Sequence, residues 1–154
     1  MAATKRIRIE VHPNIDFRTY HVAAQVSAEE THGGILGGNR HDPFRSFSFG
    51  GPEKELTDDT KATIMRFYDI EGIESVGLDI NKVVVNRSPA FDWEEIEPHI
   101  VVAIKTTVGW VDDDVEIDYR FAGKRYPDGV PEEIIEAEVE RQRRGAQMHD
   151  RMHG

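Results

Sequence analysis

Apolar and charged residues alternate near the beginning of the chain, and this alternation constrains the fold more than any other feature. Within residues 5–11, Ile7, Ile9 and Val11 share one face of an extended segment, and the residues between them are charged. Successive side chains of a strand point to opposite faces, so the pattern predicts a half-buried β-strand. Residues 12–14 are typical of a turn, and an extended pattern resumes over 17–26. We therefore predict a β-hairpin.

Two stretches carry the signals of α-helices. Thr57 is placed to cap the first, and acidic residues follow it where the helix dipole favours them. Asp92 is placed to begin the second with a capping box, and Phe91 and Ile96 are spaced as a hydrophobic staple around it. Pro98 falls inside this second helix, where it removes a backbone hydrogen bond and should bend the axis.

The remaining extended patterns complete an α+β fold. Strands are predicted at residues 73–76 and 78–86, separated by Gly77, and again at 111–121. With the hairpin, they predict a mostly antiparallel sheet of four or five strands with two helices on one face. A chain of 154 residues is about the size of one domain, and we assign residues 1–130 to it.

A third helix is predicted at the end of the chain, peripheral to the sheet. Pro131 suits its first turn, and acids near its beginning and arginines near its end complement the helix dipole. Ile135 and Val139 form only a thin apolar stripe, so the helix should pack lightly or bind a partner. Residues 131–154 are thus interpreted as a helix followed by a loose tail from residue 145.

Residues 31–52 break every periodicity through paired glycines and two prolines, and we interpret 31–56 as a Gly/Phe-rich loop insertion. Phenylalanine rings beside arginines are typical of protein interfaces, although the rings could instead fold back onto the sheet. Together with the stripe of the last helix, the predicted partner-binding residues are Arg40, Phe44, Arg45, Phe47, Phe49, Ile135 and Val139.

A series of short segments follows the order helix, turn, strand, strand, capped helix with an internal proline. The segments are Phe67, Ile70 to Val76, Asp79 to Val85, Phe91-Asp92-Trp93 and Glu97-Pro98-His99-Ile100, preceded by Val11-His12-Pro13-Asn14. In this order they resemble the N-terminal domain of the Nfu/NifU-type iron–sulfur scaffold family over about residues 8–108. The resemblance implies that family's α+β fold and a proline tolerated within the second helix.

The chain contains no cysteine. Disulfides, thiolate zinc sites, cysteine nucleophiles and thiolate-held clusters are therefore excluded. In the family that the chain resembles, a Cys-x-x-Cys in a separate C-terminal domain holds the cluster, and the N-terminal domain is regarded as an interaction or accessory domain. The resemblance thus implies a module that binds no cluster itself.

Acidic residues dominate the charge of the chain, which is −10 overall and most negative between residues 112 and 140. Such a surface repels phosphate backbones, so nucleic acid is an unlikely partner by this argument. The acids of residues 112–118 would share one strand face, either as oxygen ligands for a divalent cation or, as we favour, as a solvated surface. We predict no metal and no cofactor.

Without a nucleophile–base pair or a metal set, we expect no enzyme but a protein-binding or assembly module. A structural component of a larger particle, such as a virion, belongs to this class. The alternatives are an accessory factor in iron–sulfur assembly and an acidic inhibitor that mimics nucleic acid through residues 112–140. No apolar run spans a bilayer and the N-terminus lacks a secretory signal, so the cytoplasm is the expected compartment.

Overall fold

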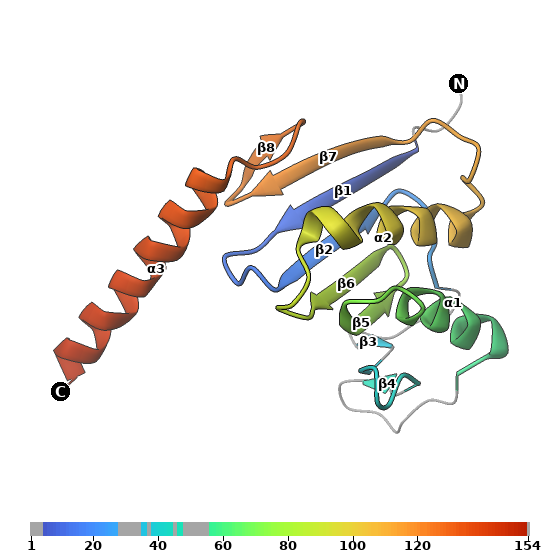
Figure 1. Cartoon of the computed structure of the whole chain (residues 1–154), viewed down its shortest axis with the longest axis horizontal. Helices are drawn as coiled ribbons and strands as arrows, with labels where there is room; N and C mark the ends of the chain where they lie inside the picture. The colour runs from blue at the N-terminus through green and yellow to red at the C-terminus, as the bar shows by residue number, and fades with distance from the viewer. Residues whose placement is uncertain (1–4, 28–34, 37, 45, 48–55, 154) are drawn as a thin grey trace.

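The computed structural model describes residues 5–27, 35–36, 38–44, 46–47 and 56–153, without the side chains of 35–36, 46–47 and 146–153. Within these ranges eight strands form one sheet, in the order β4-β3-β5-β6-β2-β1-β7-β8 (Figure 1). The five long strands are β1 (Arg6–Val11), β2 (Phe17–Val22), β5 (Ile73–Asp79), β6 (Lys82–Arg87) and β7 (Glu116–Phe121). The three short ones are β3 (Ile35–Leu36), β4 (Ser46–Phe47) and β8 (Lys124–Tyr126). Strands β1 and β7 are parallel, and the other neighbours are antiparallel.

Two helices, α1 (Asp58–Tyr68) and α2 (Trp93–Val108), cover the same face of the sheet, whereas α3 (Glu132–His153) leaves the β8 edge and extends away from the body (Figure 1). The predicted fold class is therefore confirmed. The long strands account for the expected number, and the sheet is wider because short strands extend both of its edges.

The core lies between the sheet and these two helices. The hairpin pairs Ile7 with Val22 and Ile9 with Tyr20, as the alternation predicts, and all four side chains are buried. Helix α1 contributes Ile64 and Phe67, and α2 contributes Trp93, Ile96, Ile100 and Ile104. Burial of this apolar surface is the main force that holds the helices on the sheet.

The predicted helix starts are confirmed. The side chain of Thr57 accepts a hydrogen bond from the Thr60 amide at 3.3 Å. At α2 the Asp92 amide donates to the Glu95 carboxylate at 3.3 Å, completing the capping box. These contacts satisfy amides that the first turn of a helix leaves without partners. Pro98 lies within α2, as predicted.

Gly72 provides the point at which the hydrophobic staple of α2 closes. Its φ of +100° favours glycine, and a β-carbon there would lie 2.8 Å from Phe91 Cγ and 3.1 Å from Ile96 Cγ2. Phe91 and Ile96 thus meet over the glycine, and the staple predicted from their spacing is confirmed.

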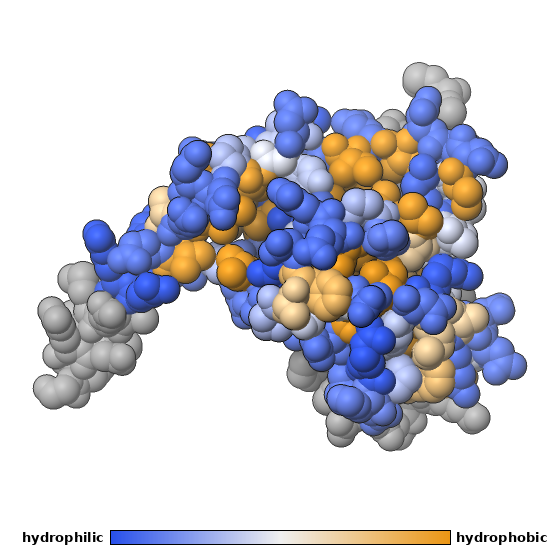
Figure 2. Space-filling view, viewed as in Figure 1, coloured by the Kyte–Doolittle hydropathy of each residue, from blue (hydrophilic) through white to orange (hydrophobic). Residues whose placement is uncertain are grey.

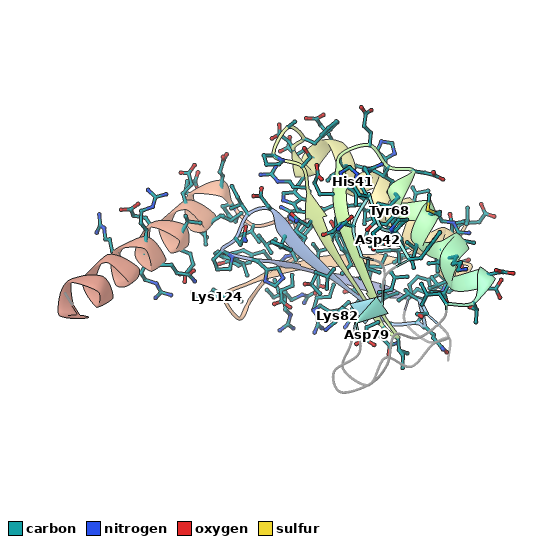
Figure 3. All side chains as sticks on the ribbon, turned by 90° about the horizontal axis from the view of Figure 1, so that it is seen from below. His41, Asp42, Tyr68, Asp79, Lys82 and Lys124 are labelled. Carbon is teal, nitrogen blue, oxygen red and sulfur yellow. The ribbon has the colours of Figure 1, made fainter. Side chains whose placement is uncertain are left out.

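The turn between β5 and β6 differs from the prediction. Gly77 lies within β5, opposite Val84, and the chain reverses at Ile80 and Asn81, between Asp79 and Lys82 (Figure 3). The carbonyls of Ile80 and Asn81 accept hydrogen bonds from the amides of Val26 and Val22. The end of β2 and the segment after it therefore help to set the position of this turn, and local sequence does not reveal that contact.

The end of the chain also differs from the prediction, because α3 continues to His153 where the sequence predicts a loose tail from residue 145. Ion pairs precede Gly145 on the helix, joining Arg141 to Glu138 at 2.6 Å and Arg144 to Glu140 at 3.2 Å. Such pairs and the good helix formers after Gly145 offset the low helix propensity of one glycine. Among the described residues, no helix combines the length and the apolar character needed to cross a bilayer.

Candidate functional site

An open groove of about 790 Å³ separates α3 from the body of the domain. Its body wall includes Ile15, Arg18 and Trp93, and its α3 wall includes Ile135, Glu136 and Val139. A second hollow shares Arg18 and Trp93 with it and continues past Glu97 to Tyr119. We call the hollow between α3 and the body the α3 groove. Figure 2 shows hydrophobic residues bordered by hydrophilic ones where the described part of α3 meets the body.

One face of α3 lines the groove over about three helical turns. The α3 residues that line the groove are Glu132, Ile135, Glu136, Val139, Glu140 and Arg143. Their spacing of three and four residues is that of a single helix face. Ile135 and Val139 are only half-buried, so the stripe predicted to bind a partner faces the groove without being covered by the body.

Trp93 forms the centre of the body wall. Its indole Nε1–H donates to the carbonyl of Ile15 at 2.7 Å, which ties the β1–β2 connection to the first turn of α2. The guanidinium of Arg18 stacks 4.9 Å from the ring centroid. Ile15 keeps 48% of its surface exposed, so this wall presents an apolar side chain beside an aromatic one.

Glu97 lines the second hollow, beside Trp93. Its carboxylate accepts hydrogen bonds from Tyr119 at 2.6 Å and from Tyr20 at 3.0 Å, and it forms an ion pair with Arg18. Burial, followed by the hydrogen bond to Glu97, raises the pKa of Tyr119. Burial and the charge of Glu97 raise the pKa of Tyr20 well above its ordinary value. Both phenols therefore remain protonated donors at neutral pH.

The two arginines of the body wall each form an ion pair within the chain. Arg18 pairs with Glu97, and Arg87 donates to the carbonyl of Phe91 at 2.7 Å and pairs with Asp16 at 3.3 Å. A bound anion would have to compete with these contacts. The groove consequently suits an apolar side chain flanked by charges better than a phosphate or a carboxylate.

Sequence reasoning missed this network. Glu97 follows Trp93 by four residues and precedes Ile100 by three, so a charged residue occupies a position on the apolar face of a helix. A charged residue at such a position was the sequence signal that could have indicated a buried ion pair. Its partners come from β2 and β7, which are distant in sequence, and the spacing alone does not identify them.

The described residues of the predicted binding loop lie at the opposite end of the sheet from the α3 groove. Strands β3 and β4 form that end, and β8 forms the end from which α3 departs. In Figure 3, His41 and Asp42 lie near Tyr68, far from Lys124 of β8. The fold thus separates Arg40, Phe44 and Phe47 from Ile135 and Val139.

Arg40 is engaged within the chain. Its Nε, Nη1 and Nη2 atoms each donate at 2.9 Å, to the carbonyls of Ile73, Tyr68 and Ile70 respectively. This residue therefore fastens the described part of the loop to the end of α1 and the start of β5.

The structure describes Phe44 with its side chain and Phe47 by its backbone alone. The Phe44 ring is 40% exposed and lies 5.6 Å from the Lys61 ammonium group. The backbone of Phe47 pairs with Ile35 in the short hairpin. Arg45 and Phe49 lie outside the described residues. Binding by this loop stays a prediction.

The acidic segment 112–118 is less regular than the sequence predicts, because β7 begins only at Glu116. Asp118 is 2% exposed and its carboxylate lies 2.8 Å from Arg125, while Glu116 pairs with Arg6 at 3.1 Å and Asp113 pairs with Lys5 at 3.0 Å. These acids are matched by bases on neighbouring strands. Within the described ranges, no three acidic or histidine side chains are grouped to hold a metal ion.

Comparisons with known proteins return similarities of structure. No family model and no curated protein sequence matches the chain. The NifU-like protein from Saccharomyces cerevisiae is similar, with a TM-score of 0.44 and 14% identity over 73% of this chain and 87% of that chain. Protein SAV1430 from Staphylococcus aureus has a TM-score of 0.43 and 15% identity over 64% and 96%. The predicted similarity to a NifU-type protein is thus found, and at this low sequence identity it concerns the fold alone.

Proposed function

We propose that this protein is a non-catalytic assembly module that holds a helical segment of a partner in the α3 groove. The observation that carries the proposal is the apolar surface left uncovered on both walls. Ile15 is 48% exposed on one wall, beside the nearly buried Trp93, and Ile135 and Val139 are half-buried on the other. A segment that fills the space removes both surfaces from water at once, which is the main driving force of association.

The shape and lining of the groove favour a helix over an extended peptide. An extended peptide is usually bound by the free edge of a sheet, whereas an amphipathic helix lays its apolar face into a groove lined by apolar side chains. The α3 wall is itself a helix face, and a second helix packs against such a face through regularly spaced side chains. Glutamates 132, 136 and 140 border the apolar stripe on α3 and would select the charges of the partner.

Phe44 supplies a second exposed apolar surface at the far end of the sheet. Contacts at both ends of one sheet suit a subunit that joins neighbours in two directions. A structural component of a larger particle, such as a virion, is one form that this assembly function takes. An accessory role in iron–sulfur assembly requires instead that the groove bind a cysteine-bearing scaffold.

The absence of cysteine makes a site-specific test possible, because an introduced thiol is the only one in the chain. Val139→Cys is labelled with a photo-activated cross-linker, and the protein is illuminated in an extract of its native source. Ala137→Cys is the matched control, since two residues along a helix turn its side chain to the opposite face. Ala137 is exposed and does not line the groove.

We expect a discrete cross-linked product from position 139 and none from position 137, and mass spectrometry identifies the partner. Further substitution of Ile135 by Asp should abolish the product, because a carboxylate on the apolar stripe opposes docking. Equal labelling from both positions, or no product from either, contradicts the proposal.

A further inference from the structure

We propose that the segment held in the α3 groove is α3 of a second copy, packed antiparallel so that each copy fills the groove of the other. This inference rests on the proposed docking function and names the partner. The result is a two-fold symmetric dimer in which the same surface of both copies is used, the commonest arrangement of homo-oligomers.

The distribution of charge along α3 selects this partner. Residues 132–140 carry five glutamates and no base, and residues 141–145 carry three arginines and no acid. Side by side in parallel, two such helices place like charges together. In antiparallel orientation, the acidic half of each lies along the basic half of the other, so the helix is complementary to itself only in reverse.

A two-fold axis beside Val139 and Glu140 brings the required groups together. Residues whose numbers add to the same total then face each other, so Glu136 of one copy lies opposite Arg143 of the other, twice in the dimer. Both residues line the groove and are exposed. Within the described part of the chain, no cation lies within ion-pair distance of Glu136, and Arg143 has only a 3.7 Å contact to Glu140.

The length of α3 allows this exchange. Its 22 residues span about 33 Å at 1.5 Å per residue, and the helix extends beyond the body (Figure 1). The groove-lining residues lie within its first 12 residues, from Glu132 to Arg143. A second α3 in the groove lies beside Val139, next to the two-fold axis, and beside Ile15 of the body, which is 48% exposed.

Charge reversal with purified full-length protein tests the arrangement, with Glu136→Arg and Arg143→Glu made separately. In a self-pair of either variant, both cross-dimer contacts join like charges. When the two variants are mixed, each contact joins opposite charges again. The molar mass of each sample is measured by light scattering and sedimentation over a wide concentration range at low salt, and helix content is checked by circular dichroism.

We expect the unmodified chain to dimerise, each single variant to dimerise at least tenfold more weakly, and the equimolar mixture to recover dimers. The variant carrying both reversals should also dimerise. A monomeric unmodified chain, or single variants that associate as strongly as the unmodified chain, overturns the inference. If purified protein is monomeric while the labelled Val139→Cys variant cross-links to a different protein, the docking function stands and the second copy is not its partner. If the labelled variant yields no product either, both proposals fail.

Discussion

Tyr119 on β7 donates a hydrogen bond of 2.6 Å to the carboxylate of Glu97 on α2. The same carboxylate receives Tyr20 from β2, so one side chain joins a helix to two strands. Strand β7 leads through the β8 hairpin to α3. The bond therefore helps to hold β7 in place, and through β8 it helps to position α3, the outer wall of the groove. We expect the stability of the groove to depend on Glu97.

Removal of the Glu97 carboxylate should destabilise the protein strongly. Glu97→Ala leaves the Arg18 charge and two phenols without their acceptor in a site where Glu97 is only 8% exposed. Breaking a buried pair in this way costs about 3–5 kcal/mol. Guanidinium chloride unfolding measures the loss. Glu94→Ala, at an exposed position on the same helix, is the control and should change the free energy of unfolding by less than about 0.5 kcal/mol. Equal losses of stability in the two variants would show that the contacts of Glu97 do not stabilise the fold.

Stability should fall at alkaline pH because burial and the bond to Glu97 raise the pKa of Tyr119. The folded chain holds this proton more tightly than the unfolded chain, whose tyrosines have a pKa of about 10. The contribution is therefore complete below about pH 10 and is lost as pH rises from there toward the folded pKa. Urea unfolding at about pH 8, 10 and 11 measures the slope. Tyr119→Phe should show a shallower decline, and a slope identical to that of the unmodified chain contradicts the assignment.

Arg40 should be replaceable by lysine only at a cost in stability. Three of its nitrogens donate to three carbonyls, and the compact ammonium group of lysine cannot reach all three. We expect Arg40→Lys to lower the free energy of unfolding by about 1–3 kcal/mol and to speed amide exchange near residues 70–74. Arg144→Lys, at an exposed position on α3 that does not line the groove, is the control and should be close to neutral. Slow exchange retained in Arg40→Lys would argue against this anchoring role.

Gly72 should tolerate alanine less well than Gly123. Both have positive φ, +100° and +80°, so both substitutions strain the backbone by about 1–2 kcal/mol. Only at Gly72 does the added methyl group meet other atoms, 2.8 Å from Phe91 Cγ, whereas the site at Gly123 is open. Gly72→Ala should therefore lower the free energy of unfolding by about 1–3 kcal/mol more than Gly123→Ala, because overpacking adds to the strain. Thermal unfolding of the two variants makes the comparison, and a smaller loss at Gly72 contradicts the staple.

Several elements were predictable because their causes are local. The alternation at Ile7 and Ile9 sets which face of a strand is buried, and the Asp92–Glu95 capping box needs only residues within one helical turn. The turn at Ile80 and Asn81 was not predictable, because the amides of Val22, at the end of β2, and of Val26, after it, bind its carbonyls. The sequence predicts a loose tail from residue 145, whereas α3 continues to His153, because the low helix propensity of one glycine is offset by its neighbours.

The sequence by itself determined that no cysteine chemistry is available, that a first hairpin and two capped helices form, and that Ile135 and Val139 share one face of a helix. Only the tertiary structure decided that this face and Phe44 lie at opposite ends of one sheet. It also decided that Glu97 meets Tyr119, 22 residues away, and Arg18, 79 residues away. Caps and side-chain periodicity depend on neighbours along the chain, whereas contacts between distant residues depend on the order in which strands pair and on the face that each helix covers.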